Sequence, residues 1–450
     1  MSQLIKENRF DGSFFNADAN VFEETLIKHS KHTLDYYCNK IYTPSRGQRS
    51  YTKPEFGYPY LGNSEMLAQN PFFVCNYTSK TKAIASDSKD SNSFFKECMI
   101  LTGRVGAIGD IAYVPKHWEN KRAIGSDNII RIEVSPEFKS GFVYAFLASK
   151  FGRQAFLKHA TGGVQPFITD KMVGSIPIPD LPLSKMMEID ELMKESLKYR
   201  DEAYNVMMEA VSLLEKSIGI DYNVGATEFV KTFSISEILS NNMRFDSAYN
   251  IKRHYLKKQA SQNIRTAKLG SFSKEIFVGS RGKRLYVKEG KPFLSSSDMM
   301  LFNPLKYANK ISCKTPGIER MVAQKDDILI SRSGTVGNVV IVGEQLNGAA
   351  VSEHALRLRV DASKIDPNYV FCYLITVHGR HVLESLPYGS VIITLGEEYV
   401  ADIDLPIVPI ETQKEVSKLI RESTEKQDLA ARKERIATFL VEQEIEKWSN

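Results

Sequence analysis

Residues 184–217, SKMMEIDELMKESLKYRDEAYNVMMEAVSLLEKS, are the stretch around which the rest of the chain is arranged. The stretch contains no Gly or Pro and is rich in Met, Leu, Glu and Lys, which favour an α-helix. Ser184 is suited to cap this helix and Gly219 to end it. At roughly 1.5 Å per residue the helix would be about 50 Å long, which exceeds the width of a small domain. We therefore expect a spacer between two bodies.

Apolar residues recur along this helix at intervals of three or four, apart from a gap around Arg200. Such a narrow seam is typical of a coiled coil. The seam consists of Met186, Ile189, Met193, Leu197, Tyr204, Met207, Val211, Leu214 and Ile218.

Residues 410–450 predict a second long helix, which is again free of Gly and contains no Pro. Two acidic helices of matched length, each with a seam, would pair antiparallel and place two domains at opposite ends with pseudo-two-fold symmetry. The apolar positions of the second helix are Val416, Leu419, Ile420, Ile436, Phe439, Leu440 and Ile445.

The segments before the two helices repeat each other. Residues 45–49 (SRGQR) recur at 280–284 (SRGKR), residues 104–109 (RVGAIG) at 332–337 (RSGTVG), and residues 176–178 (IPI) at 405–407 (LPI). Because order and spacing are both kept, we predict a duplicated domain of about 180 residues. The predicted boundaries are 1–183 for the first domain, 184–219 for the central helix, 220–409 for the second domain and 410–450 for the C-terminal helix.

Strand patterns dominate each copy. Residues 111–115, 129–134, 327–330, 338–342 and 356–360 alternate or are β-branched, whereas helical patterns cover 142–158 and 369–384. The predicted fold class is therefore α+β, with two duplicated β-rich domains separated by two long helices that pair as an antiparallel coiled coil.

Charge is unevenly distributed along the chain of 450 residues. The net charge is −3 over residues 184–219 and −1 over residues 411–449. Because the whole chain has a net charge of +5, the remaining residues have a net charge of +9. Basic globular parts favour a polyanionic partner such as nucleic acid, although ordinary solubility charge is an alternative. No apolar run is long enough for a membrane span, and the N-terminus has no signal-peptide pattern. Five cysteines without a CxxC pair fit a reducing cytoplasm and predict no zinc site.

The two SRGxR segments are the strongest candidates for a binding site. Each combines cations, a glycine and a following aromatic residue, a composition that suits phosphate contacts and bidentate recognition of guanine by Arg. A solvated loop is the alternative. The candidate DNA-binding residues are Arg46, Gln48, Arg49 and Lys53 in the first copy and Arg281, Lys283, Arg284 and Lys288 in the second.

The glycine-rich segments 103–109 and 332–337 lie between strand patterns rather than before a helix, which argues against a nucleotide site. We expect tight hairpins whose glycines permit positive φ. Arg104 and Arg332 at these hairpins could contact DNA or form structural ion pairs, and the sequence leaves both open. Residues 161–165 and 388–391 give a second pair of polar loops, in which Gln165 either reads adenine or belongs to a plain turn.

Catalytic patterns are missing from the sequence. The histidines form no metal-binding spacing, and neither an amino-methyltransferase loop nor a paired-carboxylate nuclease motif is found. Residues 353–354 (Glu-His) have no counterpart in the first copy, where Asp127 and Asn128 are aligned with them. We predict neither catalytic nor metal-binding residues.

Two similar domains, each followed by a long helix, with RxGx[IV]G hairpins and an [IL]PI exit, resemble the specificity subunit of type I restriction–modification systems. The resemblance covers essentially the whole chain and rests on the combination of motifs with the duplication. It implies that each domain reads one half of a bipartite, asymmetric site in double-stranded DNA, while the helices fix the spacing. It also implies docking of two copies of a DNA adenine methyltransferase (modification) subunit, and of a restriction subunit that drives cleavage with ATP.

The same resemblance implies no catalysis and no cofactor in this chain, with S-adenosylmethionine and ATP bound by partner subunits. Residues that differ between aligned positions, such as Gln48 and Lys283, predict different half-sites. One alternative is a DNA-binding or interaction subunit of another phage-defence complex with this fold. A second is an enzyme whose basic loops bind a phosphorylated substrate.

Overall fold

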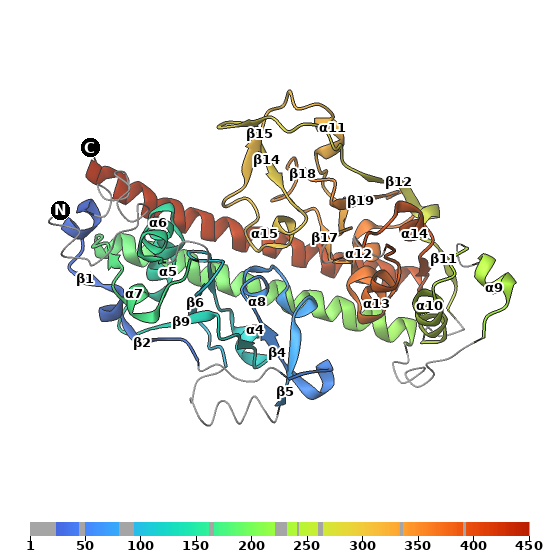
Figure 1. Ribbon diagram of the computed structural model, residues 1–450, viewed down its shortest axis with the longest axis horizontal. Coiled ribbons are helices and arrows are strands. Elements are labelled where there is room, and N and C mark those ends of the chain that lie inside the picture. Colours follow the sequence, from blue (N-terminus) through green and yellow to red (C-terminus); the bar gives the residue numbers. More distant parts are fainter. Residues whose placement is uncertain are drawn as a thin grey trace. The chain divides into compact units, whose positions relative to one another are not determined.

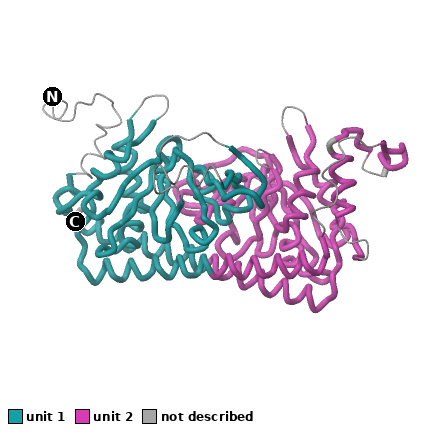
Figure 2. Tube along the Cα trace, turned by 90° about the horizontal axis from the view of Figure 1, so that it is seen from below, with its two compact units in different colours: residues 1–201, 429–450 teal, residues 202–428 magenta. Residues whose placement is uncertain are grey.

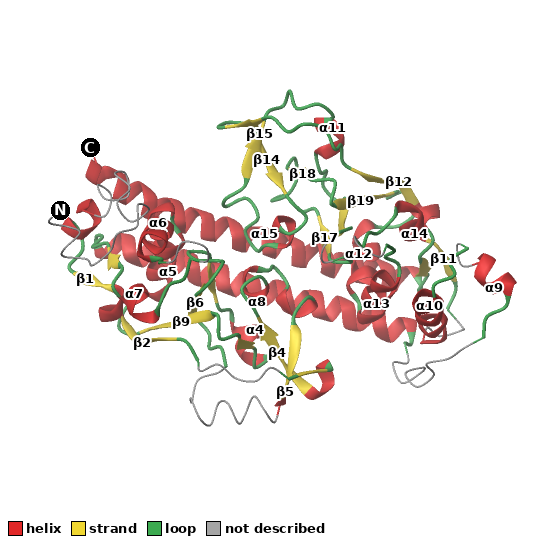
Figure 3. Ribbon diagram, viewed as in Figure 1, coloured by secondary structure: helices red, strands yellow, loops and turns green. Residues whose placement is uncertain are grey.

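The computed structural model describes residues 24–44, 50–80, 94–161, 166–220, 232–240, 243–259, 264–333, 336–389 and 393–449. The chain folds into two compact units, formed by residues 1–201 with 429–450 and by residues 202–428 (Figure 2). Each unit contains one copy of the repeat together with part of each long helix. Helices and strands are mixed in both units, as the α+β prediction requires (Figure 3).

Unit 1 holds the first copy of the repeat. Its strands are β1 (His32–Thr33), β2 (Cys38–Tyr42), β3 (Tyr51–Thr52), β4 (Gly57–Leu61), β5 (Asn76–Ser79), β6 (Ile100–Gly103), β7 (Ile111–Tyr113), β8 (Ile124–Gly125), β9 (Ile129–Val134) and β10 (Pro177–Ile178). Its short helices are α4 (Lys116–Asn120), α5 (Ser140–Ala148), α6 (Lys150–His159) and α7 (Asp170–Gly174).

Unit 2 holds the second copy. Its strands are β11 (Thr266–Lys268), β12 (Ser273–Val278), β13 (Tyr286–Val287), β14 (Lys291–Leu294), β15 (Asn309–Ile311), β16 (Ile328–Ser331), β17 (Val339–Ile341), β18 (Ala350–Val351), β19 (Ala355–Val360) and β20 (Asp404–Pro406). Its short helices are α9 (Ile235–Ser240), α10 (Ser247–Gln259), α11 (Ile318–Met321), α12 (Pro367–Ile375), α13 (Val377–Ser385) and α14 (Glu397–Ala401) (Figure 1).

The sheets of the two units have the same strand order, which confirms the predicted duplication. The order β2-β9-β6-β7 in unit 1 corresponds to β12-β19-β16-β17 in unit 2, and β3-β5-β4-β8 corresponds to β13-β15-β14-β18. The pairs β4–β8 and β14–β18 are both parallel, in sheets that are otherwise antiparallel. Even the register shift early in β2 recurs early in β12. The repeat in the sequence therefore corresponds to a repeat of sheet topology.

The helical patterns at 142–158 and 369–384 are each two helices rather than one. Ser149 separates α5 from α6, and its hydroxyl accepts a hydrogen bond from the amide of Gly152. Thr376 separates α12 from α13 and is bonded to Gly379 in the same way. A Cβ at either glycine would lie within 2.3 Å of a backbone carbonyl oxygen of the preceding helix. The glycines are therefore required for the close approach of the second helix to the end of the first.

The central helix α8 (Leu183–Ile218) agrees closely with the predicted stretch. It begins one residue earlier than expected, so Ser184 lies inside the first turn, where the carbonyl of Pro182 accepts from the amides of Lys185 and Met186. Gly219 ends the helix in the left-handed region, with φ of 64°, as predicted. The second long helix is α15 (Ile410–Glu446).

The two long helices pair antiparallel within each unit, as predicted. In unit 1 the hydroxyl of Ser196 donates to the carbonyl of Ala430 at 2.8 Å. In unit 2 the hydroxyl of Ser423 donates to the carbonyl of Ala203 at 2.7 Å. Ala203 and Ala430 are fully buried, so small residues form the contact between the helices and let their backbones approach closely.

The larger apolar residues of α8 do not form the helix–helix contact alone. Ile189, Met193 and Leu197 belong to the hydrophobic core of unit 1, together with Phe142 and Phe146 from α5. The periodic seam therefore holds the domain against the helix as well. Arg200, which interrupts the seam, is buried and donates to the carbonyl of Tyr113 at 2.8 Å.

Two predicted seam positions of α15 were wrong. Ile436 and Phe439 are exposed, by 37% and 56%. The buried apolar residues on this part of α15 are instead Ala430, Ala431, Ala437 and Val441, and the small size of three of them concealed this face in the sequence.

Carboxylates of the long helices accept hydrogen bonds from the starts of short helices. In unit 1, Glu442 accepts from the amide of Lys150, the first residue of α6, at 2.8 Å. In unit 2, Glu215 accepts from the amide of Val377, the first residue of α13, at 2.9 Å. An anion is favourable at a helix N-terminus because the unpaired amides there carry partial positive charge. Some of the acidic residues therefore anchor the domains rather than only face solvent.

Candidate nucleic-acid interface

The glycine-rich segments form the tight hairpins that the sequence predicts. Strands β6 and β7 pair antiparallel on either side of residues 104–110, and β16 and β17 pair around the second hairpin. Gly106, Gly109 and Gly337 have φ of 82°, 80° and 93°, a region that side chains disfavour. The nucleotide-site interpretation is not supported, because a strand rather than a helix follows each segment.

The residues that follow the second pair of polar loops lie directly against these hairpins. In unit 1, Phe167 pairs with Val105, and the amide of Ile168 donates to the carbonyl of Arg104 at 2.9 Å. In unit 2, the amide of Leu395 donates to the carbonyl of Arg332 at 2.9 Å. The hairpin and the chain just after the second polar loop are thus neighbours in both units. Gln165 lies outside the described residues.

The two hairpin arginines have different surroundings. Arg104 is exposed and therefore available to a ligand. Arg332 is half-buried, and its Nε donates to the carbonyl of Leu395 at 3.2 Å. The side chain of Arg332 therefore helps to fix the loop beside it, through a backbone carbonyl rather than through the ion pair that the sequence left open.

The SRGxR segments differ in how much of them the structure describes. Arg46, Gln48 and Arg49 lie outside the described residues, whereas Lys53 is exposed. In unit 2 the exposed cations of this segment are Arg281, Lys283 and Lys288.

Arg284 of the second SRGxR segment is fixed by contacts with neighbouring side chains. Its guanidinium lies over the ring of Phe293 at 4.6 Å and donates to Glu353 at 2.5 Å. Burial of Glu353 opposes its ionisation, but the hydrogen bonds from a backbone amide and from Arg284 outweigh burial and lower the pKa of the carboxyl. Arg284 is therefore fixed in position, while Arg281 and Lys283 extend from the same loop.

A short turn connects the SRGxR loop of unit 2 to its hairpin. Glu353 of this turn bonds Arg284, and the next residue, His354, shares a hydrogen bond of 2.7 Å with the hydroxyl of Ser333. The amide of Arg332 donates to the carbonyl of His354 at 2.9 Å. Neither Glu353 nor His354 belongs to a motif that identifies it as a candidate residue in the sequence. Their position between two basic segments is set by pairing between strands that are distant in sequence.

The geometry is thus a group of loops at one end of the strands of each main sheet, where exposed cations lie beside exposed aromatic and apolar side chains such as Phe167, Tyr286 and Ile393. A surface of this kind suits phosphates and base edges better than a small apolar ligand. Comparison with known proteins agrees with this chemistry, since residues 273–436 match the type I restriction modification DNA specificity domain.

Residues 273–436 are therefore similar to the DNA specificity domain of type I restriction–modification systems.

The matched residues run from the start of β12 into α15, and so include the SRGxR loop, the hairpin and the turn of unit 2. A protein of Methanocaldococcus jannaschii, assigned as the specificity subunit of the type I restriction enzyme MjaX, is 26% identical over 164 residues. The match covers 34% of this chain and 36% of that protein, so it spans about a third of the relative's length.

Solved structures of specificity subunits align with most of the chain at low similarity. A type I S subunit from M. genitalium is 15% identical, with 92% of this chain and 94% of that chain covered and a TM-score of 0.35. The HsdS subunit from Thermoanaerobacter tengcongensis is 16% identical, with 91% and 95% covered and a TM-score of 0.29.

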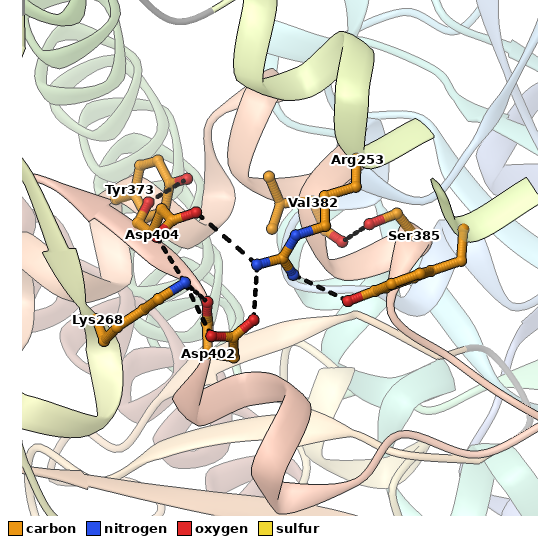
Figure 4. A network of polar contacts seen from close by, with 8 residues as sticks. Arg253, Lys268, Tyr373, Val382, Ser385, Asp402 and Asp404 are labelled. Atoms are coloured by element: carbon orange, nitrogen blue, oxygen red, sulfur yellow. Dashed lines mark hydrogen bonds and ion pairs between the residues drawn. The ribbon is translucent and has the colours of Figure 1, made fainter. Parts of the chain in front are cut away.

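A charged cluster in unit 2 has a structural role. Arg253 of α10 donates to Asp402 at 2.6 Å and to the hydroxyl of Tyr249 at 2.9 Å (Figure 4). Lys268 bridges Asp402 and Asp404 at 2.8 and 2.7 Å. A cavity of about 370 Å³ lies beside the cluster. Because these charges are paired with one another, the cluster ties α10 to the β11–β20 pair.

Within the described residues, no group of three His, Cys, Asp or Glu side chains is arranged to hold a metal ion. The five cysteines are free thiols, and burial raises the pKa of Cys38 to about 12. Among the described helices, none has both the length and the apolar character needed to cross a membrane.

Proposed function

We propose that this chain is a non-catalytic DNA sequence-recognition subunit that directs adenine methylation by partner chains. The observation that carries the proposal is the specificity-domain match over residues 273–436, which falls on a fold that recurs in unit 1. Two copies of one reading fold in a single chain are suited to the two halves of a bipartite site in double-stranded DNA.

The two half-sites differ in sequence under this proposal. The copies share their strand order but differ in sequence at the loops, as Gln48 against Lys283 and Asp127 against Glu353 illustrate. Bases are distinguished by the donors and acceptors presented to them, so different side chains on one backbone select different bases. The recognised site is therefore asymmetric.

The partners are two copies of a methyltransferase subunit and, in a complete restriction system, a restriction subunit. S-adenosylmethionine and ATP bind to those partners, and this chain contributes recognition and spacing. Exposed apolar residues on α15 support a docking role for the helix. Leu429, Ile436 and Phe439 are 40%, 37% and 56% exposed, and their spacing places them along one stripe.

Sequencing of methylated bases in the host genome, with the gene present and deleted, tests the proposal. We expect one bipartite adenine motif to lose its methylation on deletion and to regain it when the gene is restored. Selection from a random duplex library by the chain with its methyltransferase partner should return the same motif. Unchanged methylation together with no selected motif would contradict the proposal.

A further inference from the structure

One turn has the same backbone environment in both units but different side chains. It comprises residues 126–128 between β8 and β9 and residues 352–354 between β18 and β19. In each unit the amide of its first residue, Ser126 or Ser352, donates at 2.9 Å to the carbonyl of a leucine that ends the neighbouring strand. In each, the carbonyl of that serine accepts from the residue after the turn at 3.2 Å.

A fully buried arginine lies beneath the turn in each unit. Arg131 in β9 donates to the carbonyls of Gly125 and Ile129, both at 2.8 Å. Arg357 in β19 donates to the carbonyls of Val351 and Met321, both at 2.6 Å.

Arg131 bonds carbonyl oxygens on both sides of its turn, whereas Arg357 bonds Val351 just before its turn and Met321 of α11. Both arginines therefore fix the path of the backbone rather than neutralise a side chain. Removing a guanidinium from water is costly, and such a residue persists where its hydrogen bonds hold a backbone that must not move. Arg131 and Arg357 therefore act as positioning residues for the turn.

The turn lies next to the hairpin arginine of each unit. The amide of Arg104 donates to the carbonyl of Asn128 at 2.7 Å, and the amide of Arg332 donates to the carbonyl of His354 at 2.9 Å. In unit 2 the turn also bonds Arg284 of the SRGxR loop through Glu353. The turn therefore occupies the junction of the basic segments.

Asn128 and His354 of the turn are of residue types that can distinguish bases. Asn128 is partly exposed, and an Asn can bond the N6 and N7 atoms of adenine with two hydrogen bonds. The side chain of His354 is 58% exposed, and its ring can donate to the acceptors of guanine. Its Nδ1 is held by Ser333, and its Nε2 lies 3.8 Å from Glu353. Rigid placement limits the entropy lost on binding.

We propose that this turn is a specificity-determining element of each unit, in which Asn128 and His354 contact base edges of the two different half-sites. The inference rests on the proposed function and identifies residues that the basic loops alone do not provide. Contacts to the phosphate backbone position the DNA, whereas contacts from the turn select its sequence.

Selection from a random duplex library by the chain bound to its methyltransferase partner tests this inference. Asn128→Ala should relax one or two positions of one half-site, with discrimination there reduced by about five- to a hundredfold. His354→Ala should relax positions of the other half-site only. Asn120→Ala at the exposed end of α4 and His381→Ala on the surface of α13 are matched controls that should leave the motif unchanged.

Either of two results would overturn the inference. One is an unchanged motif in both variants while the wild type selects a clear bipartite site, which would leave the proposed function standing. The other is a uniform loss of affinity without a change in sequence preference, which would assign the turn to the DNA backbone. A wild-type chain that selects no motif, in a host whose methylation is unchanged on deletion of the gene, would refute the proposed function itself, and the inference with it. Thermal unfolding of each variant separates loss of recognition from loss of folding.

Discussion

Arginines serve two different purposes in this molecule, and burial separates them. Burial lowers the pKa of both Arg131 and Arg357 to about 10, yet each remains charged at neutral pH beneath a loop edge that we propose to bind DNA. Arg281, in contrast, is exposed to solvent. Residue type alone therefore identifies a DNA-binding arginine poorly, and the surroundings decide.

Arg281→Ala should weaken DNA binding, because an exposed cation in a basic loop gains its binding energy from phosphates or from a guanine edge. If it contacts phosphate, affinity falls for all sequences and the slope of log affinity against log salt decreases by about one. If it contacts a base, one half-site is relaxed and the other is kept. Titration of duplex DNA at several salt concentrations distinguishes these cases. Lys418→Ala on α15, whose side chain is 70% exposed, is the control that should bind normally.

The His117–Asp201 pair gives unit 1 a pH dependence. Burial lowers the pKa of His117 despite the attraction of Asp201, so the folded state holds a neutral imidazole beside the carboxylate, with 2.6 Å between Nδ1 and Oδ1. The unfolded chain protonates this histidine at a higher pH, near 6.5, so stability is complete above that value and declines below it. His117→Asn should lose less stability between pH 7.5 and 5.5 than the wild type in thermal unfolding. An identical decline in both would show that other groups control the acid transition.

At the scale of elements, packing of the long helices depends on small residues. Ala203 and Ala430 sit where a carbonyl of one helix accepts from a serine of the other, so a larger side chain there would push the backbones apart. Larger residues such as Met193 and Leu197 pack instead against the hydrophobic core of unit 1. Substitution of a small residue of α8 should therefore disturb the contact between the long helices, whereas substitution of a large one should disturb the core of the unit.

Ala430→Leu should destabilise the chain by about 1–3 kcal/mol, because it overpacks a close helix contact. The matched substitution Gln443→Leu, at an exposed position of the same helix, should change stability by less than about 0.5 kcal/mol. Chemical denaturation of the two variants measures the difference. Equal stability would mean that the contact at Ala430 can widen without cost.

Strands, hairpins and the long helices could be predicted because their signals are local. Residues 129–134 form β9 as expected from their β-branched run, and Gly106 and Gly109 turn the chain as expected from their lack of a side chain. The helix breaks at Ser149 and Thr376 were missed because a capping hydroxyl inside an apolar run is a weak signal.

Contacts between distant segments explain what the sequence analysis missed. Ile436 and Phe439 continue an apolar period, but periodicity does not reveal which face a partner covers, and both are exposed. The turn at 126–128 has no recognisable motif, since its shape depends on Arg131 and on the end of β4. Burial and strand pairing had to be known before Asn128 and His354 could be identified.

At the scale of the whole molecule, the prediction that the helices set the distance between half-sites can be tested without disturbing either unit. The anchors of unit 1 on α8 extend to Asp201, and those of unit 2 begin at Glu202, whose carboxylate bonds Lys426 at 2.6 Å. Seven residues inserted after Asp201, with seven after Asp428 on the opposing helix, would keep the heptad phase and leave the contacts of each unit intact.

Such an insertion adds about 10 Å of helix, which corresponds to about three base pairs of B-DNA. The methylated motif should then keep both half-sites and widen its gap by about that amount, whereas the insertion in α8 alone should break the pairing and abolish methylation. A gap that stays fixed in the double insertion would mean that the DNA, or the partner subunits, rather than these helices, determine the spacing.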